Sequence, residues 1–151
     1  MSGERTLVHA TAVAIGGRAL LLRGPSGSGK SDLALRLIDA GAQLVSDDYT
    51  QLWREGDAIL VRAPEPISGL IEVRGVGILK VEALATAPLA LIVDLVAPQN
   101  VERLPEPCSE TIFGLAIPVV AIAPFEVSAA AKLRFALATG HGDGTATTAE
   151  H

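Results

Sequence analysis

The feature that most restricts the fold of this 151-residue chain is the stretch GPSGSGKS at positions 24–31. The residues before it, RALLLR, are mostly apolar and predict a strand, whereas SDLALRLIDA after it spaces its apolar residues as a helix does. A glycine-rich turn between a strand and a helix gathers backbone N–H groups and the positive end of the helix dipole around one point. The stretch matches the Walker A pattern at every fixed position. We therefore predict an α/β fold, a P-loop nucleotide-binding domain.

The residue types within the stretch fit that interpretation. Glycines let the backbone approach phosphate oxygens, Lys30 is expected to reach the β- and γ-phosphates, and the Ser31 hydroxyl is expected to hold Mg²⁺. Guanine-specific proteins usually carry an Asn-Lys-x-Asp segment, which this sequence lacks, so ATP is the expected nucleotide. The predicted nucleotide-binding residues are Gly24, Pro25, Ser26, Gly27, Ser28, Gly29, Lys30 and Ser31.

Short apolar runs bounded by turn residues follow along the rest of the chain and predict further strands. A second helix is expected over 128–138, and the small, polar segment 139–151 is expected to be disordered. Without an internal repeat or a linker, residues 1–138 form a single domain whose sheet is parallel at least at its centre. The expected strands cover residues 6–14, 18–23, 42–48, 50–53, 58–63, 89–96 and 116–123, with two more within 70–79. Gly16 and Gly17 are expected to form the turn that joins the first two.

Composition excludes several classes of protein. The net charge of −5, without a basic block, argues against nucleic acid or an anionic membrane as the main partner. The longest apolar stretches, 83–98 and 114–125, are both interrupted by proline, and neither has the length of a clean transmembrane helix. Cys108 is the single cysteine, so no intramolecular disulfide can form and a reducing cytoplasm is the expected location.

Phosphoryl transfer needs an acid on the metal side of the phosphates, and a kinase also needs a base. The candidates are Asp47 and Asp48 as the last two residues of the expected strand over 42–48, Glu72, and Asp94 at the end of another buried strand. Neighbouring residues on a strand point to opposite faces, so both aspartates can face the metal only if the strand has already ended. On these grounds alone, Asp48 and Asp94 are equally good candidates.

Three features together resemble the catalytic domain of the HPr kinase/phosphorylase family. They are GPSGSGKSDLALRLIDAGAQLVSDD, the E-x-R-G-x-G segment within LIEVRGVGIL, and a histidine in LVHATAV before the phosphate loop. The resemblance covers about residues 6–135. It implies an enzyme that uses ATP to phosphorylate a serine of HPr, the phosphocarrier protein of the sugar phosphotransferase system, and that in many members removes the phosphate by phosphorolysis. It also implies a fold like that of phosphoenolpyruvate carboxykinase, and a homo-oligomer, typically a hexamer.

The resemblance also implies roles for individual residues. Asp48 corresponds to the base that accepts the serine proton, and Lys30 to the phosphate grip. His9 matches an active-site position of the family, Arg74 matches the arginine of the E-x-R-G-x-G segment, and Arg103 aligns less closely with an arginine on a loop over the site.

The metal ligands are implied in the same way. Ser31 and Glu72 correspond to Mg²⁺ ligands, and Asp47 becomes a supporting carboxylate on the metal side. Asp94 is then a structural residue at the end of its strand.

The sequence departs from the family pattern in two places. The chain begins almost at the catalytic domain, and in this it resembles the short family members of alphaproteobacteria. A basic stretch that the family uses in dephosphorylation is replaced by PFEVSA, where Glu126 stands in place of a base and an arginine is missing. Because an attacking phosphate prefers positive surroundings, kinase activity is the better supported half of the expected function and phosphorolysis the weaker.

Two other functions stay open at this point. A P-loop kinase of small molecules would explain the phosphate loop but not the E-x-R-G-x-G segment. A nucleotide-binding switch without catalytic activity would need Lys30 and Ser31 but not Asp48.

Overall fold

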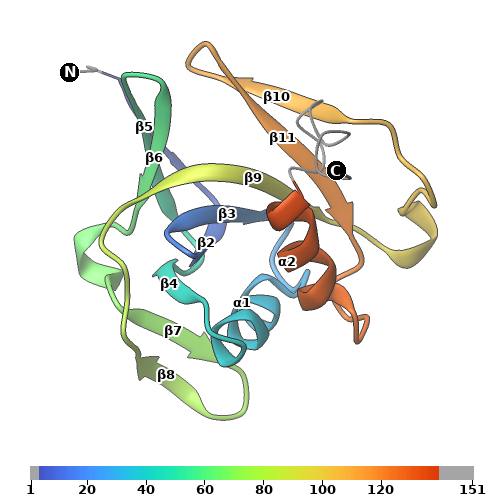
Figure 1. Ribbon diagram of the computed structural model, residues 1–151. Helices are drawn as coiled ribbons and strands as arrows, with labels where there is room; N and C mark the ends of the chain where they lie inside the picture. Colours follow the sequence, from blue (N-terminus) through green and yellow to red (C-terminus); the bar gives the residue numbers. More distant parts are fainter. Residues whose placement is uncertain (1–3, 140–151) are drawn as a thin grey trace.

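The strand that carries the phosphate loop lies in the middle of the sheet. In the computed structural model, which describes residues 4–139, β3 (Arg18–Arg23) leads into the loop and α1 (Lys30–Asp39) follows it. β3 pairs in parallel with β9 (Ala87–Leu95), and β9 pairs in parallel with β11 (Leu115–Ile122). The prediction of an α/β domain with a parallel centre is therefore confirmed, and the loop follows the carboxyl end of its strand (Figure 1).

Antiparallel strands extend this centre on the side of β3. There β2 (Ala10–Ile15) pairs with β3 and with β4 (Gln43–Ser46). Gly16 and Gly17 form the turn between β2 and β3, with φ angles of 58° and 81° that favour glycine. Two adjacent glycines are a strong signal for such a hairpin, which explains why the sequence predicts it correctly.

The other side of β9 is shared by two hairpins. The first residues of β9 pair with β6 (Ala58–Arg62), and its last residues pair with β11. β6 pairs with β5 (Thr50–Glu55), and β5 pairs with β1 (Arg5–Val8) at the edge of the sheet. In the other hairpin, β11 pairs with β10 (Cys108–Ile112). Over residues 4–139, nine strands thus form one sheet that forks at β9, and its two hairpins diverge in Figure 1.

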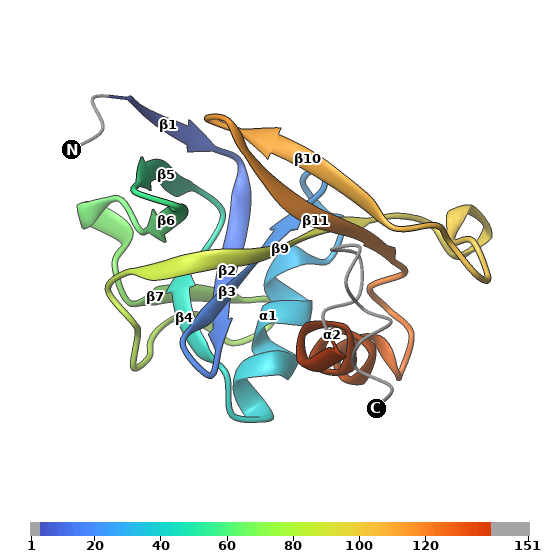
Figure 2. The same ribbon diagram turned by 45° about the horizontal axis from the view of Figure 1, so that its top comes forward.

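The remaining elements lie outside this sheet. β7 (Leu70–Val73) and β8 (Gly77–Lys80) form a separate hairpin, and α2 (Ala129–Thr139) follows β11. Two short 3₁₀ turns, Glu65–Ile67 and Pro98–Asn100, precede β7 and follow β9. α1 and α2 lie on the same face of the sheet (Figure 2). In the described part of the chain, no helix is long and apolar enough to cross a membrane.

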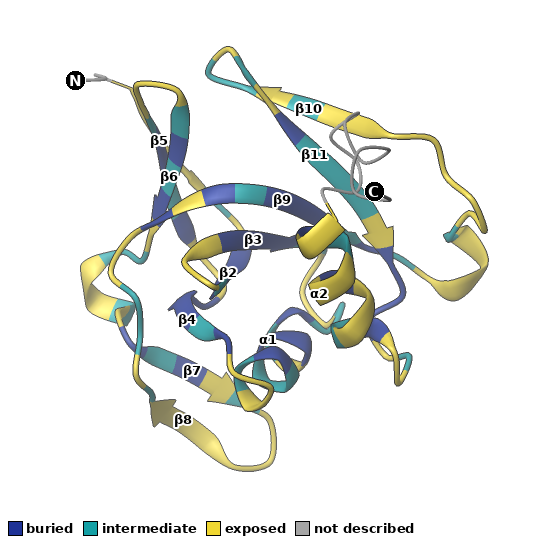
Figure 3. Ribbon diagram, in the orientation of Figure 1, coloured by how far each residue is buried: buried dark blue, intermediate teal, exposed yellow. Residues whose placement is uncertain are grey.

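Each face of the sheet has its own apolar core. On the helix face, Leu20 and Leu22 belong to a buried cluster with apolar residues of α1 and α2. On the opposite face, Ala19 and Leu21 belong to a cluster with apolar residues of β5, β6 and β11. This division follows from the alternation of side chains along a strand. β3 and β9 are largely buried as a result, whereas β8 and β10 are mostly exposed (Figure 3).

The structure corrects the sequence at three points. The predicted strand over 6–14 is interrupted at His9, where the chain bends and β1 and β2 take different partners. β10 was not predicted, because its sequence, CSETI, is largely polar and lies at an exposed edge. α2 includes Thr139, which was expected to be disordered, and the rest of that expected segment, 140–151, lies outside the described residues.

Both cores should contribute to stability. We expect Leu20→Ala, on the helix face, and Leu21→Ala, on the other, each to lower the free energy of unfolding by about 2–5 kcal/mol, because each leaves a cavity in a buried cluster. The exposed Val76→Ala should change it by less than about 0.5 kcal/mol. Urea unfolding followed by circular dichroism measures all three. If Leu21→Ala behaves like Val76→Ala, the second face of the sheet is not a packed core.

Candidate active site

The phosphate loop has the backbone geometry that anion binding requires. Gly27 and Gly29 adopt φ angles of 82° and 100°, which residues with a side chain rarely adopt. Gly29 is also the N-cap of α1, and no side chain caps this helix end. A Cβ atom at Gly29 would lie 2.9 Å from Cζ of Phe125, so a larger residue would collide with this ring. The positive end of α1 is therefore available to an anion.

Lys30 lies inside the loop. Its side chain is 5% exposed, and Nζ donates hydrogen bonds to the carbonyl oxygens of Gly24 and Pro25 at 2.7 and 3.1 Å. These bonds satisfy the ammonium group at the wall of the cavity where the sequence places the phosphates.

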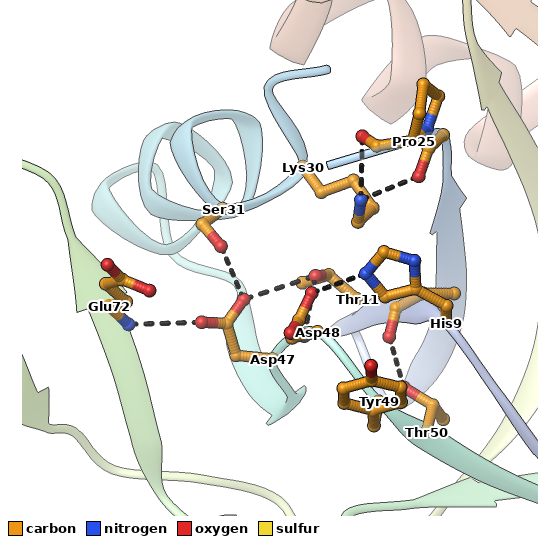
Figure 4. A network of polar contacts seen from close by, with 12 residues as sticks. His9, Thr11, Pro25, Lys30, Ser31, Asp47, Asp48, Tyr49, Thr50 and Glu72 are labelled. Carbon is orange, nitrogen blue, oxygen red and sulfur yellow. Dashed lines mark hydrogen bonds and ion pairs between the residues drawn. The ribbon is translucent and has the colours of Figure 1, made fainter. Parts of the chain in front are cut away.

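Asp47 is a buried carboxylate that accepts three hydrogen bonds. The sequence predicted Asp47 within the strand over 42–48. β4 in fact ends at Ser46, so Asp47 lies in the turn after the strand. Its Oδ1 accepts bonds from the hydroxyls of Ser31 at 2.6 Å and Thr11 at 3.2 Å, and its Oδ2 accepts one from the backbone N–H of Glu72 at 3.1 Å (Figure 4). Asp47 thus joins α1, β2 and β7 at one carboxylate.

Asp48 has different surroundings from its neighbour. Its φ of 72° places it in the left-handed region, where a residue other than glycine is uncommon. Its side chain is 55% exposed, and Oδ1 lies 2.8 Å from Nε2 of His9. Tyr49 lies beside the imidazole, with the two ring centroids 5.1 Å apart. Neighbouring residues within a strand would point to opposite faces, but β4 has already ended here. Asp47 and Asp48 can therefore both line the same cavity.

Thr11 is a site residue that the sequence analysis missed. It is fully buried, and its hydroxyl both donates to Asp47 and accepts from the backbone N–H of Asp48 at 3.0 Å. One side chain therefore holds the two aspartates in their turn. A signal was present, since Thr11 is the one hydroxyl within the apolar strand ATAVAI.

The cavity at this site has a volume of about 440 Å³, within the range of small-molecule sites. It is bounded by the phosphate loop, the aspartate turn, Glu72 and Arg74 at the end of β7, and Phe125. β7 ends at Val73, so Arg74 lies in the turn of the hairpin, but it lines the same cavity as Glu72. The structure thus brings together the loop and most of the residues singled out from the sequence.

Two predicted residues lie differently. His9 is not in the cavity wall and reaches the site through Asp48. Arg103 is exposed on the segment between the second 3₁₀ turn and β10 and does not line the cavity, so its role stays a prediction. Within the loop, Pro25 and Ser28 line a second, adjoining cavity.

Asp94 is engaged elsewhere. Arg23 is its partner in the parallel register of β3 and β9, and the guanidinium binds both carboxylate oxygens, with Nε–Oδ1 and Nη2–Oδ2 distances of 2.8 and 3.1 Å. Arg23 also donates to Glu110 at 2.9 Å. The hydrogen bond to Asp94, aided by Glu110 and opposed by burial, raises the pKa of Arg23 further above its ordinary value. Asp94 therefore has the structural role implied by the family resemblance.

The side chains around Asp47 form a donor set suited to Mg²⁺. Ser31, Asp47 and Glu72 could supply one hydroxyl and two carboxylates from one cavity wall. Mg²⁺ commonly takes one or two carboxylates and completes its shell with phosphate oxygens and water. In residues 4–139, no three His, Cys, Asp or Glu side chains are grouped so that they could hold a metal by themselves. The buried carboxylate of Asp47 has hydroxyl and amide donors and takes part in none of the ion pairs of this region.

Comparison with known proteins identifies the family. The model of the HPr Serine kinase C-terminal domain matches residues 2–133, most of the chain. The chain belongs to this family. The HPr kinase/phosphorylase of Leptothrix cholodnii is 43% identical over 133 residues, covering 80% of this chain, and that of an Acidovorax species is 38% identical over 132 residues, covering 79%.

A solved structure agrees with the fold. The Hpr(Ser) kinase/phosphatase from Coxiella burnetii superimposes with a TM-score of 0.76 at 28% identity, covering 86% of this chain and 95% of that one. The chain spans only 41% and 42% of the length of the Leptothrix and Acidovorax relatives. What is shown is therefore membership of the catalytic-domain family and its mixed α/β fold.

The two strand-end acids should behave differently when neutralised. We expect Asp47→Asn to weaken the binding of Mg²⁺–ATP by about 10–100-fold, because it removes a buried charge beside Ser31. Asp94→Asn should leave this affinity unchanged and lower the free energy of unfolding by about 1 kcal/mol or less, because its ion pair is partly exposed. Calorimetric titration with ATP, with and without Mg²⁺, measures the difference. A loss of affinity in Asp94→Asn would return Asp94 to the metal site.

Proposed function

We propose that this protein is a serine kinase that transfers the γ-phosphoryl group of ATP to the phosphocarrier protein HPr. The observation that supports the proposal is that two adjacent aspartates at the same cavity differ in burial and in hydrogen-bond partners. Asp47 is buried and bound to Ser31 of the phosphate loop, whereas Asp48, with a side chain 55% exposed, lines the same cavity. A nucleotide-binding switch needs the first acid alone, and a kinase needs both.

Asp48 is the proposed general base. A serine hydroxyl is a weak nucleophile, and a carboxylate within hydrogen-bond reach can accept its proton as the phosphorus–oxygen bond forms. The exposed carboxylate can be approached by a serine on another protein, which a buried one cannot. His9 holds Asp48 Oδ1 at 2.8 Å and leaves Oδ2 for the incoming hydroxyl. The left-handed backbone of Asp48, held by Thr11, fixes that orientation.

The positive groups of the site would stabilise the charge on the transferred group. Lys30 lies in the loop, Arg74 lies across the cavity, and the uncapped amino end of α1 adds its dipole. Mg²⁺, held by Ser31, Asp47 and Glu72, would neutralise phosphate charge when bound. Arg103 is proposed as a further contact only if its segment moves toward the cavity when substrate binds.

The substrate and the assembly rest on the family. The Leptothrix and Coxiella relatives are named for HPr, and the phosphate loop, the two aspartates and the E-x-R-G-x-G segment line one cavity here. A homo-oligomer, hexameric by resemblance, is proposed on the same basis. Phosphorolysis is the less supported activity. Where the family pattern has a basic side chain, this chain has Glu126, which pairs with Lys132 at 2.8 Å.

The base assignment predicts a selective loss of activity. Asp48→Asn should lower the rate of HPr phosphorylation by about 10²–10⁴-fold, because the serine proton loses its acceptor. Its affinity for Mg²⁺–ATP should stay within about threefold of wild type, because the metal-side contacts of Asp47 remain. Intact-mass analysis of the cognate HPr, with mapping of the modified serine, measures the rate, and calorimetry measures the affinity.

Two further variants complete this experiment. Asp57→Asn removes the same charge from the exposed turn between β5 and β6 and should phosphorylate at the wild-type rate. Lys30→Ala should abolish phosphorylation by disrupting the phosphate loop. Full activity of Asp48→Asn would remove the base assignment. Unmodified HPr in the presence of wild-type protein that binds ATP would favour a small-molecule kinase or a switch.

A further inference from the structure

A second cavity adjoins the phosphate loop on the side away from the aspartates. It has a volume of about 550 Å³ and is bounded by Pro25 and Ser28 of the loop, by residues 95–98 after β9, and by residues 123–126 after β11. These segments follow the carboxyl ends of the parallel strands, where ligands of open α/β sheets bind. Phe125 lines both this cavity and the phosphate cavity. A molecule whose phosphates lie in the first cavity can therefore reach into the second.

The walls of the second cavity are apolar. Leu95, Val96, Ala97 and Ala123 contribute aliphatic groups. Three prolines and one aromatic ring complete most of the surface. A flat, apolar ring system is the kind of group that such a surface favours over water.

The backbone of the second cavity offers few hydrogen bonds. Proline has no N–H, so Pro25, Pro98 and Pro124 remove three donors at once. Their carbonyl oxygens already accept bonds: that of Pro25 from Ser28 N–H and Lys30, that of Pro98 from Val101 N–H, and that of Pro124 from Arg36.

Two neighbouring backbone groups are also occupied. Val96 N–H donates to Ile122, and the carbonyl of Ala97 accepts from Asn100 N–H at 2.9 Å. Ser28 Oγ is buried and has no hydrogen-bond partner among the described residues, so one hydroxyl is free to bond to a ligand. Glu126 also lines the cavity, but its Oε1 accepts a hydrogen bond from Lys132 at 2.8 Å. The cavity can therefore recognise the shape and size of a group but has few free polar groups with which to recognise its polar edge.

The wall between the two cavities is held in place by the phosphate-loop helix. Arg36 of α1 donates to the carbonyl oxygens of Pro124 and Glu126, on either side of Phe125. Asp32, one turn earlier, binds Arg36 at 3.0 Å. Phe125 is thereby kept against Gly29, although its side chain is 69% exposed. An exposed ring anchored by its backbone offers a preformed surface for stacking.

We infer that this cavity is the base subsite of the nucleotide, and that it accepts adenine and guanine about equally. The inference rests on the proposed function in that the phosphate loop must hold the triphosphate. The base stacks on Phe125 and contacts the prolines, and its exocyclic groups, which distinguish adenine from guanine, find no dedicated partner. ATP is then the donor because of its abundance and not because the site selects it.

The test is a binding experiment without HPr, so that it is independent of the kinase proposal. The magnesium complexes of ATP, GTP and inorganic tripolyphosphate are titrated calorimetrically into the full chain. We expect ATP to bind about 5- to 150-fold more tightly than tripolyphosphate, as base stacking on an aromatic ring gives. ATP and GTP should differ by less than about fivefold, the value of one typical hydrogen bond. Equal affinities for ATP and tripolyphosphate, or a preference of 100-fold or more for either purine, would overturn the inference.

Ala97→Phe provides a second, local test. Ala97 is exposed at the cavity wall, so a larger side chain there should fill the space without disturbing a buried core. The ratio of the ATP and tripolyphosphate affinities should fall to about one, whereas Ala85→Phe, on an exposed loop that lines neither cavity, should leave the wild-type ratio unchanged. Using the ratio cancels any effect on the phosphate loop itself. An unchanged ratio in Ala97→Phe would show that the base lies elsewhere. If the wild-type protein shows the expected affinity ratios but does not phosphorylate HPr, the result contradicts the proposed function and leaves the base subsite standing.

Discussion

A carboxylate buried beside a phosphate loop must be satisfied by donors from its surroundings, and Asp47 takes them from three separate segments. Ser31 comes from the first turn of α1, Thr11 from β2, and the N–H of Glu72 from β7. Each bond to a charged acceptor is stronger than a neutral one, so the arrangement fixes the distance between the loop, the sheet and the outlying hairpin. The cavity exists because these three segments converge on one side chain.

Two irregularities of the sheet bring further residues of the candidate active site to this point. The end of β4 at Ser46 lets Asp47 and Asp48 face the same cavity, which an extended strand forbids. The bend at His9 separates β1 from β2 and brings the imidazole to Asp48. Strained or irregular backbone commonly gathers at functional sites, and the left-handed Asp48 is one instance. If β4 continued past Ser46, or if β1 ran into β2 without the bend, the contact between His9 and Asp48 would be lost.

Sequence reasoning succeeded where local signals are strong. The phosphate loop, α1, the Gly16–Gly17 hairpin and the buried central strands carry composition or spacing that few other structures share. It failed at β10, whose polar residues at a sheet edge look like a loop, and at Thr11, whose partners lie far away in sequence. Asp94 shows the limit most clearly. Its position at the end of a buried strand suits a metal ligand, so its own sequence context did not separate it from Asp48. The family resemblance implied a structural role, and the pairing with Arg23 across the sheet supplies the physical reason for it. Strand register is a property of the whole fold and not of a segment.

The helix that begins at the phosphate loop serves both cavities. Its amino end, uncapped by any side chain, borders the phosphate-loop cavity, while the Asp32–Arg36 pair on its first turns holds the backbone around Phe125. A shift of α1 would therefore change the phosphate cavity and the wall of the second cavity together. Because Leu33 and Leu37 fix the same helix in the core, such a shift is costly. The packing that stabilises the fold thus also fixes the two cavities relative to each other.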